Sequence, residues 1–148
     1  MTEKEHDLID QGTIAVKPYF KDGYRSKITK KSGVFYSEKA PLVLINEACL
    51  NHASTLEGRK QAVREIFRFY KPPVIIAPYH LSFFPTASYS NFNCALIFNH
   101  PFRHIATENG VSRLRFYDSI DIFVNASQHT LIQQHQRLHM VINYYRDY

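Results

Sequence analysis

With 148 residues, the chain has the length of one domain, and a domain of this size buries about two-thirds of its unfolded surface. Its composition, 45% hydrophobic and 21% charged, is typical of a globular protein, and no apolar run is long enough to cross a membrane. The acidic start MTEKEHDLID does not fit a signal or transit peptide, and two cysteines, Cys49 and Cys94, are too few for a secreted disulfide framework. We therefore expect a cytoplasmic protein without a membrane segment.

The net charge of +5 is concentrated in two short segments. Residues 11–31 contain six basic residues against Asp22 alone, and residues 57–71 contain five basic residues against two acidic ones. Residues 1–10 instead carry four acids and one lysine. Two basic segments of this kind indicate a polyanionic partner or an ordinary solvated face, and the charge alone leaves both open.

Short apolar runs separated by Gly, Pro, Asn and Ser predict a series of strands. The first two runs flank the Asp22-Gly23 dipeptide, which is typical of a tight turn. Pro78 and Pro85 favour positions at sheet edges for the strands that contain them. The predicted strands span residues 12–18, 24–31, 34–38, 41–45, 72–78, 81–87, 94–98, 113–117 and 121–124.

The strand at 24–31 has an alternating pattern. Side chains of a strand point to opposite faces in turn, so Arg25, Lys27, Thr29 and Lys31 are expected to share one face. This face would be strongly basic.

A helix is predicted from about residue 55 to about 70. Ser54 and Glu57 have the spacing of a capping box, and the Lys71-Pro72-Pro73 segment ends the helix. An apolar stripe identifies its buried face; the stripe consists of Leu56, Val63, Phe67 and Tyr70, with Ile66 beside it.

Lys60, Arg64 and Arg68 follow one another at four-residue intervals along this helix. Like charges at that spacing repel by roughly 0.2–0.5 kcal/mol per pair, which a helix selected only for stability would avoid. The line borders the apolar stripe, so we expect it at the edge of a surface groove.

The C-terminal segment predicts a helix over about 127–146, with Ser127 as its N-cap. A three-four spacing relates Leu131, His135, Leu138, Ile142 and Tyr145. The stripe fits either a dimer seam or a helix packed on its own domain, and with fewer than three heptads the second interpretation is the simpler.

The predicted fold is therefore a β-rich α+β domain with one internal amphipathic helix and one C-terminal helix. Residues 1–11 would form an acidic tail, and residues 12–148 the single domain.

Enzymatic and metal-dependent functions find little support. His135 and His139 have a ligand spacing, but Gln136 stands where a metalloprotease helix needs Glu, and Cys49 and Cys94 lack the close pairing of a zinc site. Phosphate-binding glycine loops are also missing from the sequence. We expect no enzyme, no cofactor and no metal. The 21 Tyr and Phe residues are interpreted mainly as core, with base stacking as the alternative.

An ordered set of short motifs resembles the competence transcription factor (ComK) family of Gram-positive bacteria. The motifs are GTIAV at 12–16, SKI at 26–28, FY at 35–36, GRK at 58–60, KPPVII at 71–76, FFPT at 83–86 and the cysteine at 94, with Cys49 as a further family position. The resemblance covers residues 12 to 98.

The resemblance implies a sequence-specific activator of DNA-uptake genes that binds AT-rich promoter boxes through the minor groove. It implies homodimers acting in pairs, and an adaptor that delivers the protein to a Clp protease, although the segment that binds this adaptor in relatives has no counterpart in this chain. The expected DNA contacts are the basic residues of the two segments, Arg25, Lys27, Lys31, Arg59, Lys60, Arg64, Arg68 and Lys71.

Two other functions stay open at this point. This chain is shorter than the best-known relatives, so it could occupy DNA sites or pair with a longer paralogue as an antagonist. A β-rich domain with many Tyr and Phe residues could also bind single strands or RNA.

Overall fold

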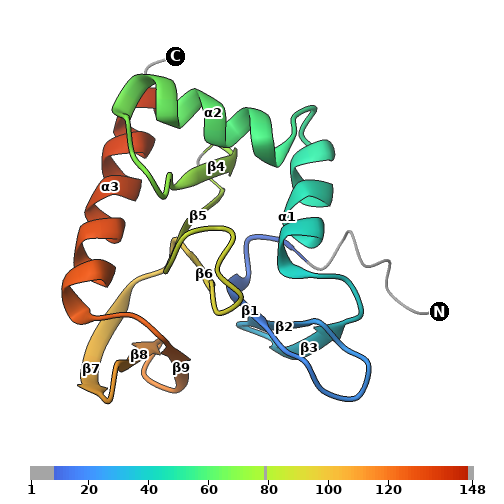
Figure 1. The fold of residues 1–148 in the computed structure, drawn as a ribbon, viewed down its shortest axis with the longest axis vertical. Helices are drawn as coiled ribbons and strands as arrows, with labels where there is room; N and C mark the ends of the chain where they lie inside the picture. Colours follow the sequence, from blue (N-terminus) through green and yellow to red (C-terminus); the bar gives the residue numbers. More distant parts are fainter. Residues whose placement is uncertain (1–8, 79, 147–148) are drawn as a thin grey trace.

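The computed structural model describes residues 9–78 and 80–146, and these form a β-rich α+β domain, as predicted (Figure 1). The strands are β1 (Thr13–Pro18), β2 (Ser26–Lys30), β3 (Gly33–Ser37), β4 (Val74–Ala77), β5 (Leu81–Pro85), β6 (Leu96–Phe98), β7 (Phe102–Glu108), β8 (Val111–Phe116) and β9 (Ile120–Val124). The helices are α1 (Pro41–Leu50), α2 (Leu56–Phe67) and α3 (Gln128–Arg146). None of the helices in the described ranges is long and apolar enough to cross a membrane.

The strands form two antiparallel sheets. The larger sheet has the order β3-β2-β1-β6-β5-β4, and the smaller sheet has the order β7-β8-β9. Because side chains alternate along a strand, the larger sheet contributes to two separate cores: Phe83 belongs to one and Phe84 to the other. The large sheet therefore lies between two other layers.

The helices α1 and α2 cover one face of the large sheet, with Leu44, Ile45 and Leu56 in the first core. The helix α3 and the small sheet cover part of the other face, with Leu114 and Leu138 in the second core. Figure 1 shows α2 across the top of the molecule with β4 beneath it, α3 along one side, and the small sheet and strands β1–β3 of the large sheet at the bottom. Val34 and Tyr36 of β3 remain 47% and 41% exposed.

The strand predicted at 41–45 is wrong, because this segment begins the helix α1. Pro41 occupies the first turn, where a missing N–H costs nothing, and Ala40 before it is extended. The buried residues Leu44, Ile45, Ala48 and Cys49 lie on one helical face. A run of five apolar residues fits a strand or a buried helix equally well, and packing against β1 and β4 favours the helix here.

The helix predicted at 55–70 is present but shorter. Thr55, not Ser54, is its N-cap and accepts a hydrogen bond from the Gly58 N–H at 3.0 Å. The helix ends at Phe67, because Arg68 adopts a left-handed conformation with φ of 59°. Tyr70, predicted for the buried face, is 93% exposed.

The helix α3 begins where the sequence predicts, since the Ser127 Oγ accepts a hydrogen bond from the Thr130 N–H at 3.1 Å. Its apolar stripe packs on its own domain: Leu131 and Leu138 are 1% and 0% exposed in the second core. The dimer-seam interpretation therefore does not fit these two side chains.

One strand was missed, and the predicted N-terminal tail is described only in part. The strand β7 was not predicted, because the mixed sequence FRHIATE has mostly exposed side chains and no apolar run. The acidic tail predicted at 1–11 lies outside the described residues up to residue 8, whereas Ile9 is buried in the first core and Asp10 forms an ion pair with Lys30 at 2.8 Å.

Candidate nucleic-acid interface

The basic residues predicted to contact DNA fall into two groups at opposite ends of the molecule (Figure 1). The first group lies on or beside β2 and comprises Arg25, Lys27 and Lys31. The second group lies on α2 or in the segment after it and comprises Arg59, Lys60, Arg64, Arg68 and Lys71. The two groups therefore do not form one continuous line of charge.

The sequence pattern predicts Lys60 at the exposed edge of a groove, but the structure buries this residue. Its side chain is only 7% exposed, and its Nζ lies 2.7 Å from the Glu57 carboxylate and 4.4 Å from the centre of the Tyr89 ring. The apolar stem is buried along the sheet-facing side of α2, and the ammonium has two partners within the protein. These two contacts hold the Lys60 ammonium against the protein.

The other four residues of the second group differ in exposure: two are half-buried and two are exposed. The Arg59 Nε donates to the Ser54 Oγ at 3.0 Å, so this half-buried side chain ties α2 to the turn before it. Lys71 is half-buried too, and its carbonyl accepts a hydrogen bond from Gln134 of α3. Arg64 and Arg68 are exposed, but the end of α2 at Phe67 means that they no longer share one helical face.

A residue outside the predicted set, Lys17 of β1, lies directly opposite Lys27 of β2. Like charges directly opposite each other on one face of a sheet are destabilising. Burial of the Lys17 ammonium, and then the charge of Lys27, lower the pKa of Lys17. The Lys17 Nζ donates to the backbone carbonyl of Phe123 in β9, so this lysine pair faces the small sheet.

Lys31, just past the end of β2, extends this basic face towards the β8–β9 turn. Its Nζ lies 4.5 Å from the centre of the Tyr117 ring, a cation–π contact. The Tyr117 hydroxyl is 2.6 Å from the Nδ1 of His100, the residue two positions after β6. Tyr117 therefore connects the turn of the small sheet to the large sheet.

A hollow of about 420 Å³ lies between these elements, and we call it the lysine groove. One wall is β1–β2 and the start of β3, and the other is the segment 119–123 of β9 and the turn before it. Four lysines line it, Lys17, Lys27, Lys30 and Lys31, with Asp121 as the acidic residue on the facing wall. Four lysines around one hollow favour an anionic ligand.

Three tyrosine rings lie together beside Lys27, one of the residues that line the lysine groove. Tyr36 is directly opposite Lys27 in the β2–β3 pair, and its ring centre lies 4.8 Å from that of Tyr19 and 5.5 Å from that of Tyr24. Tyr24 and Tyr36 are 38% and 41% exposed. Basic side chains with aromatic rings beside them are typical of surfaces that bind nucleic acids.

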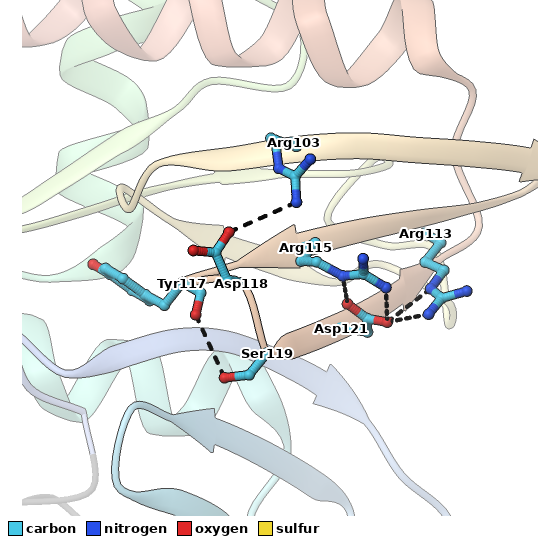
Figure 2. Close-up of polar contacts among 7 residues, drawn as sticks. All are labelled: Arg103, Arg113, Arg115, Tyr117, Asp118, Ser119 and Asp121. Atoms are coloured by element: carbon cyan, nitrogen blue, oxygen red, sulfur yellow. Dashed lines mark hydrogen bonds and ion pairs between the residues drawn. The ribbon is translucent and has the colours of Figure 1, made fainter.

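The small sheet carries three arginines outside the predicted set, on β7 and β8. Figure 2 shows Arg113 and Arg115 of β8 on either side of the Asp121 carboxylate, and Arg103 of β7 directed towards Asp118. The signal in the sequence is the alternation RLRF at 113–116, in which both arginines fall on the face opposite Leu114 and Phe116.

The histidines and cysteines do not form a metal site in the part of the chain that the structure describes, where no group of three or more potential ligands occurs. His135 and His139 do come together, with 3.2 Å between their Nε2 atoms, and the His135 ring packs against Phe102. Cys49 and Cys94 are both free and buried.

Comparison with known proteins gives one family and one relative. The sequence model of the ComK protein family matches residues 4–147. The competence transcription factor of Bacillus subtilis (strain 168) is 36% identical over 92 residues, a match that covers 60% of this chain and 48% of that protein. The chain thus matches about half the length of this curated relative. No solved structure matches the chain.

Proposed function

The chain belongs to the ComK protein family, and from this premise we propose that it is a DNA-binding regulator of transcription that acts on competence genes. The relative in Bacillus subtilis is a competence transcription factor, which supports the proposal. The protein would bind AT-rich promoter duplexes through the minor groove, where Arg and Lys side chains read a narrow and strongly negative groove. It is proposed as a binding protein, without catalysis.

The observation that carries the proposal is the facing pair of Lys17 and Lys27 in the lysine groove. Two lysines opposite each other repel, and a phosphate placed between them would turn this repulsion into two attractions. Lys31 at the end of β2 would contact the next part of the backbone, and Arg25, exposed just before β2, would contact it at the other end.

The exposed residues Arg64 and Arg68 form the rival surface, since the sequence favours the α2 segment for DNA contact. A matched pair of double variants separates the two surfaces. Lys27→Gln/Lys31→Gln and Arg64→Gln/Arg68→Gln each remove two exposed or half-exposed cations. Arg64, which lies within a helix, is replaced by a residue of similar helix propensity.

The experiment is a salt titration of binding to an AT-rich duplex and to a GC-rich duplex of equal length. Each phosphate contact contributes about −0.9 to the slope of log affinity against log salt. We expect the slope to flatten by about 1.8 in the Lys27/Lys31 variant and to stay unchanged in the Arg64/Arg68 variant. The opposite result would move the interface to the α2 segment. Absence of duplex binding by the wild-type protein would refute the proposal as a whole.

A second candidate function is binding of single-stranded nucleic acid, and the Tyr19, Tyr24 and Tyr36 rings favour it. Exposed aromatic rings stack on unpaired bases, and alanine substitution of such rings typically costs about 1–3 kcal/mol per base. Competition between AT-rich duplex and single strands of the same sequence at fixed salt distinguishes the two functions. Preference for the single strand would favour the second.

Homodimer formation belongs to the proposal as well. Because Leu131 and Leu138 of α3 are buried in their own domain, a dimer contact would use a different surface. Sedimentation of the wild-type protein with and without duplex measures the assembly directly.

A further inference from the structure

The outer face of the small sheet holds two arginines in a fixed arrangement. Ser112, Leu114 and Phe116 of β8 are buried, so the alternate residues Arg113 and Arg115 point away from the core. Arg115 is directly opposite Asp121 of β9. The strand register therefore brings the Asp121 carboxylate between the guanidinium groups of Arg113 and Arg115. We call these two arginines the arginine pair.

The contacts within this group are short and directional (Figure 2). The Arg115 Nε and Nη2 donate to the two Asp121 oxygens at 2.8 and 3.0 Å, and the Arg113 Nε donates to Oδ2 at 2.7 Å. The Arg113 Nη2 lies 2.5 Å from the same oxygen. These hydrogen bonds, from Arg115 first and Arg113 second, hold the pKa of Asp121 well below its ordinary value.

The arginine pair still has donors to spare. A guanidinium has five N–H groups, and Asp121 engages two on each arginine. The side chains of Arg113 and Arg115 remain 41% and 29% exposed. One carboxylate neutralises one of the two positive charges, so the group keeps a net charge of +1.

The arginine pair adjoins the lysine groove. Asp121 and Phe123 line that groove, the Lys17 Nζ donates to the Phe123 carbonyl across it, and the Arg113 guanidinium lies 5.8 Å from the centre of the Phe123 ring. An anionic chain in the lysine groove therefore runs along the strand that carries Asp121.

We propose that Asp121 is a positioning residue that fixes the arginine pair against the duplex bound in the lysine groove, and that the fixed pair makes binding selective for sequence. This inference rests on the function proposed above. A guanidinium with a fixed plane recognises an acceptor by geometry, whereas a lysine acts as a mobile point charge. The lysines then supply affinity for any duplex, and the arginine pair supplies discrimination between duplexes.

The test is Asp121→Asn, compared with Asp118→Asn as the matched control. Asp118 lies in the turn next to the same strand, is 93% exposed and lies 3.7 Å from Arg103, so its replacement removes the same charge without releasing the arginine pair. The measured quantity is the ratio of affinities for AT-rich and GC-rich duplexes at fixed salt.

We expect Asp121→Asn to lower this ratio by about tenfold, because a well-oriented contact with a base discriminates by about that factor. Its affinity for the GC-rich duplex should stay the same or rise, since the protein becomes more positive. Asp118→Asn should leave the ratio within about twofold of wild type. Arg115→Lys, which keeps the charge and loses the planar fork, should lower the ratio with an unchanged salt slope.

An unchanged ratio in both Asp121→Asn and Arg115→Lys would overturn the inference, because the group would then only hold β8 to β9. If Asp121→Asn does not fold, Arg115→Lys decides the question alone. Failure of the proposed function shows differently, as absence of duplex binding by the wild-type protein, and it would remove the basis of the inference at the same time.

Discussion

Lys60 provides the sharpest test of the difference between the sequence pattern and the folded protein. The sequence predicts an exposed cation in a line with Arg64, whereas its side chain is 7% exposed, beside Glu57 and above the Tyr89 ring. The perturbation is Lys60→Gln, which leaves helix propensity nearly constant and removes the charge.

The expected cost follows from the contacts that are lost. A desolvated cation–π contact contributes about 1–2 kcal/mol, and the pair with Glu57 adds less than about 0.5 kcal/mol because the Glu57 side chain is 78% exposed. The free energy of unfolding should therefore fall by roughly 2 kcal/mol. For a chain of this size the melting temperature would fall by about 4–8 °C.

The assay combines thermal unfolding with the salt titration on AT-rich duplex, and Arg64→Gln is the control on the same helix. Arg64 is exposed, so its replacement should change stability by about 0.5 kcal/mol or less. Lys60→Gln should lower the melting temperature and leave the salt slope as in wild type. A variant that melts like wild type but binds with a flatter slope would show that Lys60 contacts DNA, and the structural account of this residue would be refuted.

Two more predictions concern the cores. Leu138→Ala should lower the free energy of unfolding by about 2–5 kcal/mol in urea titrations, since Leu138 is fully buried and the substitution leaves a cavity; a loss below about 1 kcal/mol would mean that α3 does not complete the second core. Burial raises the pKa of both the Cys49 and the Cys94 thiol, so both should react with an aromatic disulfide reagent at pH 8 at least about tenfold more slowly in the folded protein than in urea, and faster as pH rises; equal rates in the two states would contradict their burial.

Most of the strands and the tight turns between them follow from local sequence patterns, because these elements depend on neighbours along the chain. Asp22-Gly23 was predicted as a turn, and both residues have positive φ, 57° and 82°. Asn109-Gly110 has the same form, with φ of 53° and 77°, and connects β7 to β8. Alternation and turn residues carry this information locally.

Helix boundaries were determined only in part. The N-cap of α3 at Ser127 follows from its hydroxyl and the residues after it. The end of α2 does not follow from the sequence, because Arg68 is a non-glycine residue with φ of 59°. The left-handed conformation is rare for arginine, so the surrounding structure must maintain it, and no local sequence pattern predicts it.

The surroundings of the charged residues depend on the folded protein and do not follow from the sequence pattern. Whether Lys60 is buried, whether Lys17 faces Lys27, and whether Asp121 lies between Arg113 and Arg115 all depend on strand register and on packing between segments far apart in the chain. A count of charges does not distinguish these residues. In the folded protein Lys60 is buried beside Glu57, and Lys17 and Lys27 repel each other. Arg113 and Arg115 are both held by the Asp121 carboxylate. Burial and pairing arise from contacts across the fold, and local propensity does not encode them.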